Sequence, residues 1–128
     1  MENSKIRDFT DLDAWKKAHE LALGIYRLTS LFPKSETFAL TSQIQRAAVS
    51  ITSNIAEGFG RQTMREKVQF YYQAQGSLTE VKSQLILSRD LKYISPQEFD
   101  KIMSTLVIAH KLLQGLLRKT KSFINLKS

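Results

Sequence analysis

The sequence contains no cysteine, only two prolines and five glycines, and no long apolar run. Without cysteine, the chain forms neither disulfides nor zinc sites with thiolate ligands. No apolar stretch approaches the ~18 residues that a membrane-spanning helix requires. Residues 1–9 carry charged side chains where a signal peptide would be apolar. We therefore expect a protein of the cytoplasm.

Patterns typical of catalytic and cofactor sites are also missing. Both histidines, His19 and His110, lack the glutamate three residues earlier that a di-iron helical bundle uses, because Lys16 and Val107 occupy those positions. The glycines at residues 58 and 60 follow no strand pattern and do not complete a dinucleotide-binding fingerprint. The sequence also lacks the Gly-x-Ser-x-Gly motif of many hydrolases. We expect a protein that is not an enzyme and needs no metal or cofactor.

Charge is unbalanced in favour of cations, with 19 Lys+Arg against 12 Asp+Glu and a formal net charge of +7. Such an excess attracts polyanions, first nucleic acid and second anionic membrane surfaces. It also keeps proteins soluble without any polyanionic partner. Composition alone therefore leaves both explanations open.

Apolar residues recur at spacings of three and four in four stretches, and strict alternation never persists. These stretches predict helices over about residues 13–31, from 35 to 58 or 60, over 63–93 and from 95 onward. Because the connections are short, successive helices must pack antiparallel. We expect an all-α, antiparallel up-down-up-down four-helix bundle that forms a single domain over residues 1–128, with flexible ends at about 1–9 and 122–128.

Helix boundaries are predicted from local start and stop signals. Pro33 should end the first helix, and Ser35 is a candidate N-cap for the second. Residues 63–66 (Thr-Met-Arg-Glu) have the pattern of a capping box. Residues 95–98 (Ser-Pro-Gln-Glu) combine an N-cap serine, a proline at the first helical position and a glutamate three residues after the cap. This last signal is the clearest of the four.

The second predicted helix has unusually few positions suited to water. One arc should face the core and comprises Leu40, Ile44, Ala48, Ile51, Ile55 and Phe59. Another arc is polar and comprises Gln43, Arg46, Ser50, Asn54, Glu57 and Arg61. Ala47, Val49 and Ala56 lie off both arcs. Since a helix this apolar is seldom solvated on its outer side, we expect it to pack also against another copy of the chain.

Two interpretations of this polar arc stay open. It can be a hydrogen-bonded network within or between subunits, since buried amides and charges need partners. Alternatively, Arg46 and Arg61 can contact phosphates, although Glu57 would repel a polyanion. We favour the first. The candidate residues for the oligomer interface or network are Gln43, Arg46, Val49, Ser50, Asn54, Ala56 and Glu57.

Cations gather in two segments that a four-helix bundle brings together. The first contains Lys111, Arg118, Lys119 and Lys121, in a stretch without any acid from residue 109 onward. The second contains Arg61, Arg65 and Lys67, at the turn into the third helix. Because the second and fourth helices run parallel, both clusters should share one pole of the bundle and form a candidate nucleic-acid site. In the alternative interpretation, the first cluster only complements the helix dipole.

Residues 43–51 (Gln-Ile-Gln-Arg-Ala-Ala-Val-Ser-Ile), followed by residues 53–58 (Ser-Asn-Ile-Ala-Glu-Gly) and Arg61, carry a family resemblance. They resemble the bacterial four-helix-bundle proteins known as 23S rRNA intervening-sequence proteins, a ribosomal-protein-like family. Further agreement lies at Leu12, residues 15–18 and residues 76–78, and the resemblance covers roughly residues 9–117. The chain departs from the family pattern at Gln45, Thr52 and Lys92, where arginine, proline and glycine are frequent.

The resemblance implies a homopentameric ring of four-helix bundles. The family is similar to the accessory variability proteins of diversity-generating retroelements, which are basic pentamers that bind nucleic acid and a reverse transcriptase. The leading hypothesis is therefore an oligomeric scaffold that binds RNA, DNA or a nucleic-acid-handling protein. The alternative is a protein–protein adaptor without nucleic-acid binding. We expect no membrane attachment, because the apolar face of the fourth helix is needed for the core.

Overall fold

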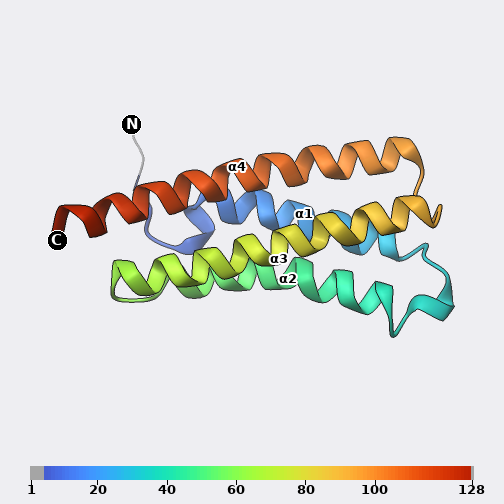
Figure 1. Cartoon of the computed structure of the whole chain (residues 1–128), viewed down its shortest axis with the longest axis horizontal. Coiled ribbons are helices and arrows are strands. Elements are labelled where there is room, and N and C mark those ends of the chain that lie inside the picture. Colours follow the sequence, from blue (N-terminus) through green and yellow to red (C-terminus); the bar gives the residue numbers. More distant parts are fainter. Residues whose placement is uncertain (1–4, 128) are drawn as a thin grey trace.

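Four long helices make up most of the computed structural model, which describes residues 5–127 and the side chains of residues 5–124 (Figure 1). They are α1 (Asp13–Thr29), α2 (Leu40–Phe59), α3 (Met64–Asp90) and α4 (Pro96–Lys127). Two short 3-10 helices, η1 (Phe9–Asp11) and η2 (Lys34–Glu36), precede α1 and α2. No strand occurs in the described range, so the predicted all-α four-helix fold is confirmed.

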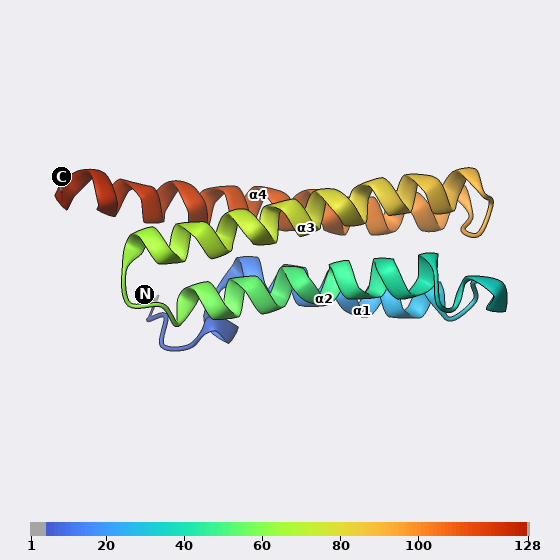
Figure 2. The same cartoon turned by 60° about the horizontal axis from the view of Figure 1, so that its bottom comes forward.

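Helices that follow one another in the chain pack together, and α4 closes the bundle by packing against α1 (Figures 1 and 2). The turn from α2 to α3 and the last turns of α4 lie at the same end, which we name the α2–α3 pole. The opposite end, with η2 and the turn from α3 to α4, is named the η2 pole. This arrangement follows from the short connections, which force antiparallel neighbours. None of the described helices combines the length and apolarity needed to cross a membrane.

The core contains the arc that the sequence predicts for α2. Five of its members are buried, and Phe59 packs partly buried against them. Opposite them lie the buried residues of the other helices, among them Leu21, Ile25, Tyr71, Leu85 and Leu113. Burying one such side chain stabilises the fold by about 1.5–3 kcal/mol. The bundle is therefore held together mainly by apolar contacts between all four helices.

The structure corrects the predicted start of the second helix. Residues 34–36 form η2 instead. Ala39 then has a non-helical backbone conformation, with φ −123° and ψ −105°, and α2 begins after it at Leu40. Ser35 is thus not the N-cap of α2. Glu36 takes over part of that role, since its Oε1 accepts a hydrogen bond from the Leu40 N–H at 3.3 Å.

Other boundaries differ by two or three residues. α1 ends at Thr29 and α3 at Asp90. Beyond each end, backbone N–H groups bond to carbonyls three residues earlier, as Leu31 does to Leu28 and Lys92 to Arg89, so the chain turns more tightly than an α-helix. The expected flexible ends lie partly outside the described residues, which exclude 1–4 and 128. Within the described range, α4 runs on to Lys127.

Helices begin at both predicted start signals, but only residues 95–98 make both bonds of a capping box, whereas at residues 63–66 the structure shows only the Thr63 bond. Ser95 Oγ accepts from the Glu98 N–H at 3.0 Å, and the Ser95 N–H donates to Glu98 Oε1 at 2.8 Å. Thr63 Oγ1 accepts from the Glu66 N–H at 3.1 Å. These bonds satisfy backbone donors that would otherwise lack a partner in the first helical turn.

Lys92 has φ 65° and is the one non-glycine residue with positive φ in the described range. It ends α3 in a Schellman motif, in which the Tyr93 N–H donates to Ser88 O and the Lys92 N–H to Arg89 O, both at 2.9 Å. Glycine suits this position best because it has no Cβ. The Tyr93 hydroxyl then donates to Glu36 Oε2 at 2.8 Å, which ties this turn to η2.

Candidate nucleic-acid interface

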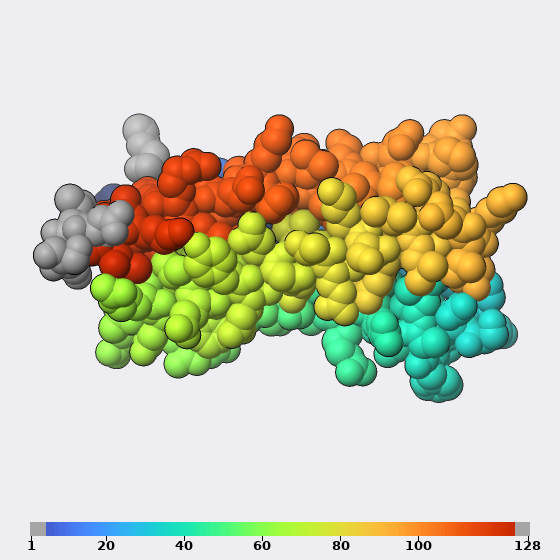
Figure 3. All heavy atoms as spheres, in the orientation of Figure 1, coloured from blue at the N-terminus to red at the C-terminus, as the bar shows by residue number. Residues whose placement is uncertain are grey.

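The two predicted groups of cations do lie at one pole of the bundle. Figure 3 shows the start of α3 beside the last turns of α4, and the Lys121 ammonium donates a hydrogen bond to the Tyr72 hydroxyl at 2.7 Å. Arg118 and Lys119 are exposed within the same turns of α4. Lys111 is also exposed, but it lies two helical turns nearer the middle of the bundle.

The cations of the α2–α3 turn are partly used by the fold itself. Arg61 pairs with Glu57 at 2.8 Å, and its guanidinium lies 4.6 Å from the centre of the Phe70 ring. Lys67 donates a hydrogen bond to Phe59 O near the end of α2, and partial burial lowers the pKa of its ammonium. A cation at this position complements the exposed carbonyls of a helix C-terminus. Arg65 is exposed.

A groove runs between α3 and α4 at the α2–α3 pole. It has a volume of about 490 Å³ and is lined by Tyr72, Gln75, Gln114, Leu117, Arg118, Lys121 and Ser122. No acidic residue is among these, so both charged residues of the lining are cations. We name this feature the α3–α4 groove. It joins positive charge, an aromatic ring and amide groups in one place.

Among the groove residues the sequence predicted only Arg118 and Lys121, and it missed the aromatic one, Tyr72. In the sequence, Phe123 is the only ring among the C-terminal cations, which favours contacts with phosphates over contacts with bases. Tyr72 lies 49 residues before Lys121 and meets it only because α3 and α4 pack antiparallel. One sequence signal could have pointed to Tyr72. Tyr72 and Gln75 are three residues apart, and this spacing places both side chains on the same face of α3.

The polar arc of α2 divides between the interior and the surface. Ser50 and Ser77 of α3 share a hydrogen bond at 2.8 Å, and the Asn54 amide donates to Ser50 O and Ser50 Oγ at 2.9 and 3.0 Å. We name this contact the α2–α3 seam. The remaining candidates, Gln43, Arg46, Val49 and Glu57, are exposed, and Ala56 is half-buried on the side of α1.

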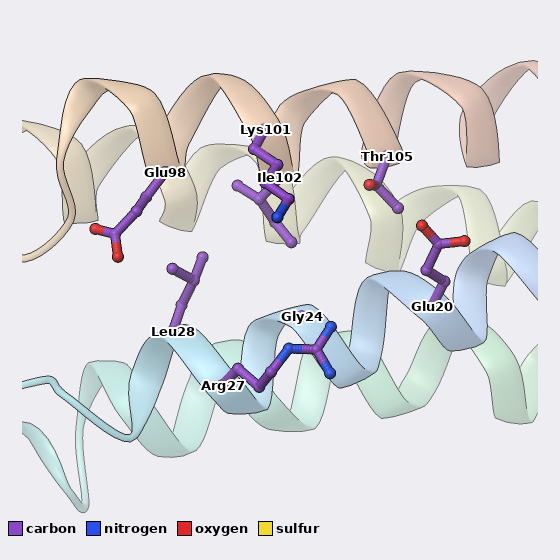
Figure 4. A pocket seen from close by; sticks show the side chains of 8 residues that line it. All are labelled: Glu20, Gly24, Arg27, Leu28, Glu98, Lys101, Ile102 and Thr105. Carbon is purple, nitrogen blue, oxygen red and sulfur yellow. The ribbon is translucent and has the colours of Figure 1, made fainter.

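A second hollow, of about 230 Å³, lies between α1 and α4 (Figure 4). Its charged lining residues are two acids and two bases, namely Glu20, Glu98, Arg27 and Lys101. Its floor includes Gly24, where an added Cβ would come within 2.6 Å of Ile102 Cδ1. Because the charges balance, this hollow is not suited to a polyanion.

The histidines make ordinary packing contacts. His19 stacks on Trp15 with ring centres 4.7 Å apart, and His110 Nε2 lies 3.4 Å from the Gln75 amide nitrogen. In the part of the chain that the structure describes, no group of three or more His, Cys, Asp or Glu residues could hold a metal ion. The α3–α4 groove is therefore the most distinctive surface feature.

Comparison with known proteins agrees with the fold. The model of a family described as "23S rRNA-intervening sequence protein" matches residues 10–115. The structure is similar to the crystal structure of a protein of unknown function from the S23 ribosomal protein family of Bacteroides thetaiotaomicron VPI-5482. The TM-score is 0.75 and the sequence identity 25%, over 81% of this chain and 97% of that one. No curated protein matches the sequence.

Proposed function

Since the chain belongs to the 23S rRNA-intervening sequence protein family, whose model matches residues 10–115, we propose that it is a non-enzymatic, homo-oligomeric scaffold of the cytoplasm. Its α2–α3 pole binds RNA or DNA. A pentamer is the expected assembly, and a reverse transcriptase or another nucleic-acid-handling protein is an expected partner in the same complex.

The observation that carries nucleic-acid binding is the acid-free α3–α4 groove. Arg118 and Lys121 line it, Lys119 lies beside it, and Lys111 extends the row of cations along α4. Cations that neutralise phosphates release condensed counterions, so such binding weakens steeply as salt rises. A guanidinium also matches the geometry of a phosphate group better than an ammonium does.

A salt titration with labelled RNA and DNA tests this proposal. We expect the wild-type chain to bind both at low salt and to lose affinity as salt increases. Reversing two charges, Arg118→Glu with Lys119→Glu, should weaken binding by at least tenfold and flatten the salt dependence. The matched control, Lys34→Glu with Lys101→Glu, makes the same charge change at the η2 pole. An equal loss in both double variants, or no binding by the wild type at low salt, would contradict the proposal.

Self-association is supported by the surface that α1 and α2 share. Only five of the 20 residues of α2 are exposed, against 13 of the 27 residues of α3. Three large apolar side chains, Leu23, Tyr26 and Val49, are exposed on this pair of helices. Since Gln45 contacts Thr29 at 3.0 Å and the helices are antiparallel, Tyr26 and Val49 lie at about the same level. A second copy would cover this strip.

Sedimentation measures the assembly directly. We expect a mass several times that of the 14.7 kDa chain, and Val49→Asp or Ala56→Asp should reduce it because a carboxylate would be buried in the interface. Val107→Asp is the control, because Val107 on α4 is exposed to the same 42% as Val49. If both α2 variants keep the wild-type mass, the interface lies elsewhere.

One observation favours the alternative function, an adaptor that binds only proteins. Phe38, between η2 and α2, is 96% exposed, and Leu31 is exposed nearby in sequence. Exposed aromatic residues are enriched in protein–protein interfaces. The same titration separates the two functions, because an adaptor of this kind would bind no nucleic acid even at low salt.

A further inference from the structure

The ring of Tyr72 is held at its hydroxyl end, and its face is not covered by the cation that holds it. The Lys121 nitrogen lies 2.7 Å from the hydroxyl oxygen and 5.4 Å from the ring centre. The difference between these distances matches the length from the ring centre to its hydroxyl oxygen. The ammonium therefore sits beyond the hydroxyl, in line with the C–O bond, and not over the ring.

Exposure and orientation together suit this ring for stacking. Tyr72 is 47% exposed although it lies between two helices. The bond from Lys121 restricts the rotation of the side chain, so less conformational entropy is lost when a flat ligand binds. Nucleic-acid bases stack on aromatic side chains irrespective of base identity, because every base has a π-face.

The other polar residues that line the groove have the chemistry that a nucleotide requires. Arg118 and Lys121 provide the positive charge for a phosphate. The amides of Gln75 and Gln114, on opposite walls, offer donors and acceptors that can reach the edge of a base. No carboxylate lines the groove to repel the phosphate.

The groove is large enough for one nucleotide of a single strand and too small for a duplex. Its volume of about 490 Å³ lies in the range of pockets that take one small molecule. In a duplex the bases are stacked and paired inside, so their faces cannot reach a side chain on a helix bundle. Only an unpaired base can lie flat on Tyr72.

We propose that the α3–α4 groove binds one unpaired nucleotide of RNA or DNA, with its base stacked on Tyr72 and its phosphate held by Arg118 and Lys121. This inference rests on the proposed nucleic-acid binding and specifies the ligand as single-stranded. Phosphate contacts by the neighbouring cations attract any nucleic acid, whereas the Tyr72 ring gives the preference for single strands.

Fluorescence anisotropy with labelled single strands and duplexes tests the proposal. Oligo(U) and oligo(dT) of roughly 12 nucleotides serve as single strands, and RNA and DNA duplexes of equal length as comparison. Tyr72→Leu should weaken binding to single strands about tenfold and leave duplex binding within about twofold. Tyr72→Phe, which keeps the ring, should stay close to wild type. Phe38→Leu is the control, because it removes an exposed ring at the opposite, η2 pole and leaves the strip shared by α1 and α2 unchanged.

A second readout reports the stacking itself. A 2-aminopurine base in the single strand should lose fluorescence on binding the wild type and keep it on binding Tyr72→Leu, while circular dichroism confirms that the variant is folded. If Tyr72→Leu binds single strands like the wild type, or loses duplex binding equally, the proposed nucleotide site is wrong, while nucleic-acid binding by the cations of the α2–α3 pole is not contradicted. If the wild type binds neither strand form at low salt, the proposed function fails as well.

Discussion

The two flanks of α3 are built from contrasting residues. Toward α2, the α2–α3 seam is closed by small groups, with Ser77 against Ser50 and the backbone of Gly58 against Phe70 and Tyr71. Toward α4, long side chains such as Arg118 and Lys121 leave the α3–α4 groove open. Small residues therefore bring α3 close to α2, whereas long basic residues leave a groove between α3 and α4.

Two successive tyrosines mark the two flanks. Tyr71 is fully buried beneath Gly58, and burial raises the pKa of its hydroxyl to about 12. Tyr72 points toward α4 and remains half exposed, because neighbouring residues on a helix are 100° apart. One step along the chain therefore separates a structural ring from a candidate binding ring.

The largest expected loss of stability at the close contact between α2 and α3 comes from Gly58→Val. A Cβ at Gly58 would lie 2.8 Å from Tyr71 Cε1 and 2.9 Å from Phe70 Cβ, so the two helices would have to move apart. We expect a loss of about 2–3 kcal/mol in the free energy of unfolding, measured by chemical denaturation. Gly76→Ala on the exposed side of α3 is the control and should gain about 0.5–1 kcal/mol, since an added Cβ there meets nothing within 4 Å. Similar effects at both glycines would refute the close-packing explanation.

A pH titration tests the burial of Tyr71 beside the close contact of α2 and α3. The pKa of Tyr71 is raised from 10.0 to about 12 by burial, so folding favours its neutral form. The resulting stability is fully present below pH 10 and is lost as the pH rises through about 12. We expect Tyr71→Phe to reduce the fall in stability across this window, measured by urea unfolding at a series of pH values. A wild-type profile in the Tyr71→Phe variant would contradict this.

Removing the hydrogen bond of the α2–α3 seam should have a smaller effect on the free energy of unfolding. Ser77→Ala removes one partner of the bond to Ser50, which should cost about 1 kcal/mol in unfolding free energy. Gln75→Ala, on the opposite flank, should cost less than about 0.5 kcal/mol because its amide makes only a long contact at 3.4 Å. Thermal or urea unfolding of both variants measures the difference. Equal costs would mean that the two flanks do not differ in this respect.

The smallest expected effect is a gain at the turn that joins α3 to α4. Lys92→Gly relieves the cost of a positive φ but also increases the freedom of the unfolded chain. We expect a net gain of about 0.5 kcal/mol, measured by urea unfolding. Lys82→Gly, within α3, should instead lose about 1 kcal/mol. A loss in both variants would show that Lys92 contributes more than its backbone conformation.

Much of the fold could be predicted because it depends on patterns between residues that are close in the sequence. Apolar spacing identified the four helices, and residues 95–98 gave a start signal that depends only on neighbours in sequence. The start of α2 could not be predicted in this way. There Glu36 accepts hydrogen bonds from both Leu40 and Tyr93, so this boundary involves a contact with a residue that is 57 positions away in the sequence.

The candidate site was predicted in part. The cation clusters were placed at one pole, but local spacing could not reveal that Lys67 is engaged with Phe59 O or that Lys121 meets Tyr72. The first contact depends on how α3 turns back over α2. The second depends on the register of two long helices, which the packing of their apolar faces decides.

The left-handed turn at Lys92 also has a mechanical consequence for the opposite end of the molecule. From Pro96 to Lys121, α4 spans about 38 Å at about 1.5 Å per residue. A tilt of about 3° at the turn would therefore displace Lys121 by about 2 Å, enough to break its contact with Tyr72. Because α4 is this long, a change of a few degrees at the Lys92 turn would alter the width of the α3–α4 groove at the opposite pole.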